Sequence, residues 1–174
     1  MKSPRVLFRS LICCCLFALP LGAADPVPQP SVTSTDPVQI ETALISRIHA
    51  TALADTDVDG LLSSGSPFPD IVAPSVLLAR RTMAVCGWLQ SDNEYGRAMK
   101  LAQRSLARLA SMQETNDADR AERLYWEALL EGWVLDQKTK AIATLEAAQK
   151  LKPDDDRLVE LEHELAAAVA EFGR

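Results

Sequence analysis

Three aspartates at alternate positions, Asp55, Asp57 and Asp59, precede Gly60 and come nearest in type and spacing to a metal site. Calcium prefers oxygen ligands, alternating aspartates can direct carboxylates at one cation, and glycine permits the sharp turn of a binding loop. The segment therefore predicts a weak calcium site. The alternative is that these acids form the solvated end of the preceding helix.

The same segment, DTDVDG, resembles the start of an EF-hand calcium loop, in which Leu62 would fill the apolar eighth position. The twelfth position of such a loop normally carries a bidentate glutamate, but here it is Ser66. Pro67 and Pro69 follow at once, so the helix that leaves an EF-hand loop is not expected. The resemblance accordingly implies low calcium affinity.

Groups for enzymatic catalysis are not found in a working arrangement. His49 and His163 are isolated on predicted helix surfaces, without the spacing of a metal-ligand pair. Ser63, Ser64 and Ser66 lack the strand-to-helix turn of a nucleophile elbow, and no glycine-rich phosphate loop occurs. We therefore expect no enzyme activity, no cofactor and no small-molecule substrate.

The charge balance also limits the partners. The full chain has a net charge of −6, and nucleic-acid binding requires a basic surface. An acidic chain is likewise not attracted to anionic lipid. We expect no nucleic acid partner, and contact with a membrane only through the N-terminal segment.

That segment, residues 1–24, has the order of a secretory signal peptide: basic residues, the apolar run Leu11–Leu19, and small residues up to Ala24. A membrane span needs about 20 apolar residues, so this run is too short unless the signal stays uncleaved. We expect cleavage after Ala24 and a periplasmic or secreted protein. Removal of residues 1–24 would leave Cys86 as the sole cysteine, predicted to be a small buried thiol.

Residues 25–37 are rich in proline, serine and threonine, which favours a disordered linker. Residues 38–73 are expected to form an N-terminal helix, capped by Asp36, and an acidic loop. Residues 74–174 are predicted to be nearly all helical, because alanine and leucine dominate and apolar positions recur at helical spacing. The expected helices are Val38–Ala54, Pro74–Leu89, Tyr95–Met112, Asp119–Leu135, Thr139–Leu151 and a final helix that reaches Phe172.

A pattern of small residues occurs twice in residues 74–174. Ala141, Leu145, Ala148 and Pro153 occupy the positions that a tetratricopeptide (TPR) repeat gives to its second helix and closing proline. The segment EYGRAMKLAQRSLARL aligns with it when Ala98 is matched to Ala141. The two alanines lie farther apart than the usual period of about 34 residues. The region therefore resembles a degenerate TPR repeat.

The resemblance implies an all-α fold: antiparallel helical hairpins stacked as a short TPR-like superhelix, with an extra N-terminal helix and a C-terminal capping helix. Apolar residues on one side of the last helix suit that capping role, namely Leu158, Leu161, Leu165 and Val169. Two repeats are fewer than the three usually needed for a continuous core, so the N-terminal helix or a homodimer could supply the missing cover.

The resemblance also implies a groove, lined by the first helix of each repeat, that binds a protein or peptide. By register, the groove residues are Arg80, Met83, Gly87, Arg123, Trp126, Glu127, Leu130 and Trp133. Trp126, Leu130 and Trp133 are spaced to share one helical face, and tryptophan and arginine are common at binding hot spots. The alternative is that both tryptophans pack against the capping helix.

These patterns predict a non-enzymatic, exported interaction module that acts as an adaptor, assembly factor or accessory subunit in the bacterial envelope. Two alternatives stay open: a weak calcium-binding protein using the DTDVDG segment, and a self-associating structural element.

Overall fold

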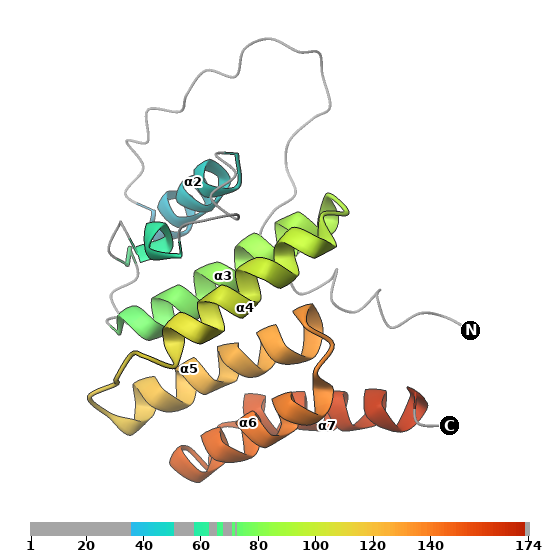
Figure 1. The fold of residues 1–174 in the computed structure, drawn as a ribbon. Coiled ribbons are helices and arrows are strands. Elements are labelled where there is room, and N and C mark those ends of the chain that lie inside the picture. The colour runs from blue at the N-terminus through green and yellow to red at the C-terminus, as the bar shows by residue number, and fades with distance from the viewer. Residues whose placement is uncertain (1–35, 51–57, 63–65, 68–70, 72, 173–174) are drawn as a thin grey trace. The chain divides into compact units, whose positions relative to one another are not determined.

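Antiparallel helical hairpins make up the larger part of the structure. The structure is a computed structural model, and it describes residues 36–50, 58–62, 66–67, 71 and 73–172. No β-strand occurs among these residues, so the predicted all-α class is confirmed. Helices α3 (Pro74–Ser91) and α4 (Tyr95–Leu109) form the first hairpin. Helix α5 (Asp117–Leu129) and helix α6 (Lys138–Leu151) form the second, and α7 (Asp156–Phe172) follows it. Figure 1 shows the two hairpins and α7 in this order.

The helix boundaries follow local chemistry. Pro74 occupies the first turn of α3, where its missing N–H is not needed. Asn116 caps α5 by accepting a hydrogen bond from the Asp119 backbone N–H at 2.8 Å. Most predicted helices agree with the structure to within a few residues. The fourth differs at its C-terminal end, where the predicted α-helix over 119–135 is interrupted.

The interruption is a π-helical turn, η3 (Leu130–Val134), between α5 and the second hairpin turn. The backbone N–H of Leu135 donates to the carbonyl of Leu130 at 3.0 Å, one residue farther than in an α-helix. Gly132 lies inside this turn, and a Cβ added there would be 2.8 Å from Leu165 Cδ2 of α7. Glycine therefore allows η3 to approach α7 closely.

Small residues stand where the helices of each hairpin meet. Ala98, Ala102, Ala141 and Ala148 are all fully buried, as the sequence predicted. Cys86 is buried as predicted, and its thiol donates to the Ala98 carbonyl at 3.4 Å. These contacts join α3 to α4 and pack α6 against α5 and η3, because small side chains let helix axes come close.

Both hairpins turn through a residue with a left-handed backbone. Asn93 has φ of 64° before α4, and Asp136 has φ of 57° before α6. Asn and Asp adopt this conformation more readily than most residues. Asn93 precedes Ala98 by the same number of residues as Asp136 precedes Ala141, so the two turns are equivalent.

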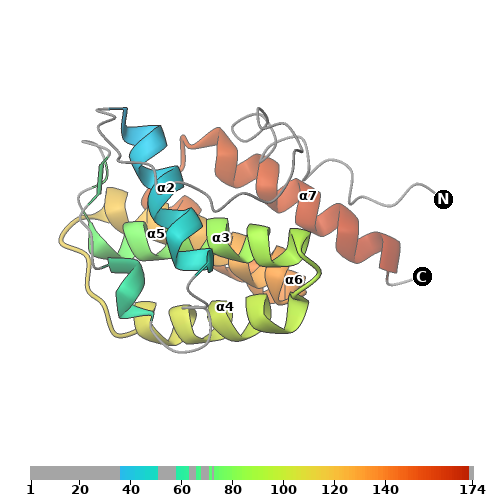
Figure 2. The same cartoon turned by 90° about the horizontal axis from the view of Figure 1, so that it is seen from above.

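Helix α2 (Pro37–Ala50) packs on α3, as does the short 3-10 helix η2 (Asp59–Leu62). Figure 2 shows α2 lying across α3. Asp36 caps α2 as predicted, accepting a hydrogen bond from the Val38 N–H at 3.0 Å. The positions 51–54, which were also assigned to this helix, lie outside the described residues.

The last helix packs against α6 as the expected cap. Leu158, Leu161 and Leu165 are buried, whereas Val169 is 38% exposed and does not belong to that buried row. In the part of the chain that the structure describes, no helix is both long enough and apolar enough to cross a membrane.

Candidate docking surface

The predicted groove residues divide into two groups in the structure. Their helices, α3 and α5, are in contact. Met83 is only 5% exposed and Leu130 is fully buried. Met83 lies on the inward face of α3 and Leu130 on the inward face of η3, so both belong to the core. Their assignment to the groove is therefore corrected. Partial exposure remains at five of the predicted positions, although only 12% of the Arg123 side chain is exposed: Arg80, Gly87, Arg123, Trp126 and Trp133.

Arg123 and Glu127 form a largely buried charged cluster instead of an open surface. The Arg123 guanidinium pairs with Glu127, one turn along α5, and its Nε lies 2.6 Å from Glu114 Oε1 in the α4–α5 loop. Burial raises the pKa of the Glu127 carboxyl, and the Arg123 charge partly offsets that effect. The cluster ties α5 to the loop before it, so its role in the structure is to position α5.

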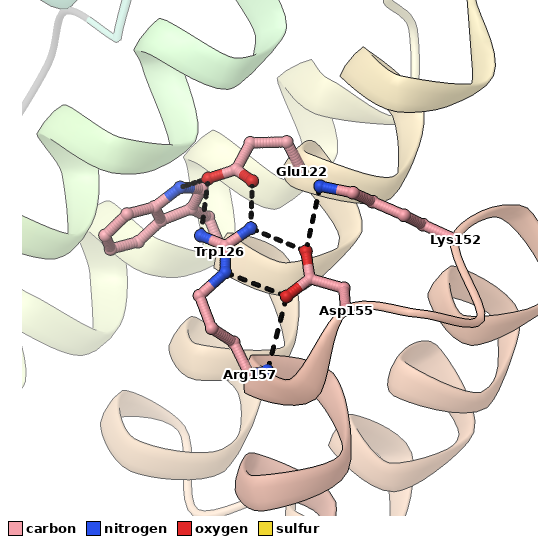
Figure 3. A network of polar contacts seen from close by, with 5 residues as sticks. All are labelled: Glu122, Trp126, Lys152, Asp155 and Arg157. Atoms are coloured by element: carbon pink, nitrogen blue, oxygen red, sulfur yellow. Dashed lines mark hydrogen bonds and ion pairs between the residues drawn. The ribbon is translucent and has the colours of Figure 1, made fainter.

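Trp126 is held in one orientation by hydrogen bonds (Figure 3). Its indole N–H donates to Glu122 Oε1 at 3.0 Å. The Glu122 carboxylate is itself held by Arg157 of α7, with 2.7 Å from Nη2 to Oε2 and 3.4 Å from Nη1 to Oε1. In the figure the indole ring points away from the turn that carries Lys152 and Asp155. The half-buried Trp126 ring on α5 is therefore held in place by Glu122, which is itself held by Arg157.

Asp155 completes this network from the turn between α6 and α7. Its carboxylate accepts from Arg157 Nε at 3.0 Å and from Nη2 at 2.7 Å, and Lys152 Nζ lies 3.1 Å from it. The hydrogen bonds from Arg157 hold the Asp155 pKa well below its usual range. The same contacts raise the pKa of Arg157, so both groups stay charged and α7 stays joined to α5.

Tyr125 lies beside this network. The Arg157 guanidinium carbon is 4.9 Å from the centroid of the Tyr125 ring, a cation–π contact. The Tyr125 and Trp126 rings meet edge to face with centroids 5.4 Å apart. Burial raises the Tyr125 pKa, and the Arg157 charge acts in the opposite direction. Two aromatic rings are thus packed and oriented on the same turn of α5.

Trp133 is placed differently from the sequence expectation, because the π turn shifts it relative to Trp126. Regular α-helical spacing would put Trp126, Leu130 and Trp133 on one face, but Leu130 is buried while both tryptophans are partly exposed. Gln90 at the end of α3 donates to the Trp133 carbonyl at 3.5 Å. Trp133 therefore lies where the end of α3 meets η3.

A hollow of about 360 Å³ opens at the start of α3, between that helix and the loop before α5. Its lining includes Glu114 and Asp119, but each is engaged: Glu114 pairs with Arg123, and Asp119 accepts from the Asn116 amide at 2.7 Å. The two carboxylates of the hollow are therefore both occupied by contacts within the chain.

The predicted calcium ligands lie mostly outside the described residues. Among the described residues, no group of three or more His, Cys, Asp or Glu side chains could hold a metal ion. Asp55 and Asp57 lie outside those residues, and of Asp59 the structure describes only its place in η2. The calcium hypothesis therefore stays a prediction.

Cys86 has no features of a reactive thiol. It is fully buried, and burial raises the pKa of its thiol to about 12. The thiolate, which is the reactive form, is therefore strongly disfavoured.

Sequence reasoning missed Arg81, the largest fully buried side chain. The repeat register selects its neighbour Arg80, but Arg81 falls in the inward register of Leu78, Val85 and Leu89. That register was the available signal. Its carboxylate partner, Glu41, is distant in the sequence, so no local pattern could identify the pair.

Comparison of the chain with protein-family models, with curated proteins and with solved structures gives no match.

Proposed function

We propose that this protein is an exported, non-enzymatic interaction module of TPR-like type that binds a protein partner in the bacterial envelope. Two equivalent hairpins support the TPR-like assignment, since each has a left-handed turn residue at the same distance before a buried alanine. The N-terminal segment, with the order of a signal peptide, supports export. The partner would dock where Trp126 of α5 and Trp133 of η3 are partly exposed.

The observation that carries this proposal is the fixed orientation of Trp126. Its indole N–H is bonded to Glu122, and Glu122 is held by Arg157. Ordering a side chain on binding costs roughly 0.5–1.5 kcal/mol, and here that ordering is already present in the free protein. A large, pre-oriented aromatic ring with a charged rim is the usual composition of a binding hot spot.

Affinity capture from envelope extract tests the proposal. Three full-chain baits are compared. They are the wild type, a double variant with Trp126→Ala and Trp133→Ala, and a control double variant with Glu146→Ala and Lys150→Ala. The control residues are exposed on α6 and leave the net charge unchanged. We expect the same partner with wild type and control, and at least a tenfold loss with the tryptophan variant, since hot-spot truncation costs about 2 kcal/mol or more.

Thermal melting of each bait shows whether it is folded. If a folded tryptophan variant captures the same partner as the wild type, the docking surface is wrong. If Trp126→Ala unfolds the chain, Trp133→Ala alone replaces it in the comparison.

A further inference from the structure

Helix α4 has a basic outer face in an otherwise acidic chain. The sequence of α4, YGRAMKLAQRSLARL, contains four basic residues and no acidic one, although the chain as a whole has a net charge of −6. Lys100, Arg104 and Arg108 follow one another at four-residue spacing and are exposed. They therefore form one basic stripe along the helix. Lys100 and Arg104 make no ion pair within the described part of the chain.

An apolar stripe runs along the opposite edge of the exposed side of α4, separated from the basic stripe by the exposed residues Gly96, Gln103 and Ala107. Tyr95 is 50% exposed and Met99 is 41% exposed, one turn apart. Leu106 lies further along the same side of α4 and is partly exposed. Exposed apolar side chains and two basic side chains without ion pairs therefore lie on the same outer side of α4.

Helix α7 has the complementary face. Asp156, Glu160 and Glu164 are exposed at the same four-residue spacing, and none of them forms an ion pair in the described structure. Val159 is 39% exposed beside them. Ala166 and Ala170 continue that side of the helix and are exposed. An acidic stripe therefore runs beside a stripe of apolar and small residues.

We propose that the basic face of α4 docks on the acidic face of α7 in a second copy of this chain, with the two helices antiparallel. On both helices the charged stripe lies on the same side of the apolar stripe when viewed along the chain, so antiparallel pairing matches both. One register places Lys100, Arg104 and Arg108 opposite Glu164, Glu160 and Asp156.

The same register places Tyr95, Met99 and Leu106 opposite Ala170, Ala166 and Val159. Successive members of each charged stripe are about 6 Å apart along the axis, so all three ion pairs form together. The contact joins different surfaces of the two copies and is therefore heterologous, which permits species larger than a dimer. The contact does not involve Trp126 or Trp133, and its failure would not affect the docking surface proposed above.

Sedimentation velocity of the full chain over a range of concentrations tests this inference by charge reversal. Arg104→Glu and Glu160→Arg are measured singly and together. Arg120→Glu and Glu146→Arg serve as controls, because both residues are exposed, lack ion pairs in the described structure and lie on neither face.

We expect wild type and controls to self-associate. Each single reversal should weaken association about tenfold or more, because like charges then meet. The double reversal should restore it to within about threefold, because the pair is re-formed with its signs exchanged. A monomer at all concentrations, or a double variant no better than the singles, overturns the proposal. The proposal also fails if the wild type stays monomeric but binds phosphatidylglycerol vesicles in a way that Arg104→Glu abolishes, since the basic face would then serve a membrane.

Discussion

The guanidinium of Arg81 lies against the carboxylate of Glu41 in a two-pronged ion pair, with 2.8 Å from Nε to Oε1 and 2.9 Å from Nη2 to Oε2. The remaining Nη1 donates to the Leu61 carbonyl of η2 at 2.6 Å. Arg81 is fully buried, so one α3 side chain joins both α2 and η2 to the first hairpin. Helix α2 and η2 therefore cover α3. The sequence predicted that the N-terminal helix could supply such cover, because two repeats are too few to bury a continuous core.

Removing Arg81 should be strongly destabilising. Arg81→Met leaves Glu41 buried without its partner, which costs about 3–5 kcal/mol in the free energy of unfolding. Urea unfolding followed by circular dichroism measures this. Arg120→Met is the matched control, exposed and without an ion pair in the described structure, and should change stability by less than about 0.5 kcal/mol.

The double change Arg81→Met with Glu41→Met separates the ion pair from simple packing. It removes both charges, so it should be more stable than Arg81→Met alone. An Arg81→Met protein as stable as the Arg120→Met control would contradict the structural role assigned to the pair.

Gly132 should tolerate no side chain. A Cβ at this position would stand 2.8 Å from Leu165 Cδ2 and 3.4 Å from Ala141 Cβ. Overpacking of this kind costs about 1–3 kcal/mol, so Gly132→Ala should lower the melting temperature. Gly96→Ala in α4 is the control: nothing lies within 4 Å of its added Cβ, and helix propensity favours alanine by up to about 1 kcal/mol. Equal melting temperatures for the two variants would show that η3 and α7 do not approach closely.

Asp155 should make the protein sensitive to acid. Its pKa is lowered in the folded state by hydrogen bonds from Arg157. Its stabilising contribution is therefore complete above the unfolded pKa of about 3.9 and is lost as pH falls through the folded value. Asp155→Asn should cost up to about 1 kcal/mol at pH 7, because the Arg157 and Lys152 side chains are about half exposed and solvent screens their charges. It should also flatten the decline of unfolding free energy between about pH 5 and pH 2.

Unfolding titrations of the two proteins at several pH values measure this difference. Asp154→Asn is the control, because Asp154 is exposed and its carboxyl makes no ion pair in the described structure. Parallel stability curves for Asp155→Asn and wild type would rule out the network as a stabilising contact between α5 and α7.

Local patterns in the sequence predicted the helices well, because their causes are local. The Asp36 cap, Pro74 in the first turn of α3, and the buried alanines Ala98 and Ala141 are all properties of nearby residues. Helical periodicity also indicated that Cys86 faces inward, and it is buried.

The features that were missed depend on residues far away in the sequence. The π turn at Gly132 accommodates Leu165 of α7, so regular periodicity wrongly carried the α-helix through it and placed Leu130 on the surface. Met83 was assigned to the groove by repeat register, yet it packs in the core. The Glu122–Arg157 contact, which orients Trp126, joins α5 to α7 and has no signature in either segment.

Site-specific photocrosslinking in the envelope tests the central claim most directly. A photoreactive benzophenone amino acid replaces Trp133 in one chain and Glu146, exposed on α6, in another. The account predicts a discrete adduct with one other protein from position 133 and none from position 146. No adduct from position 133, or the same adducts from both positions, would contradict a docking surface on α5 and η3.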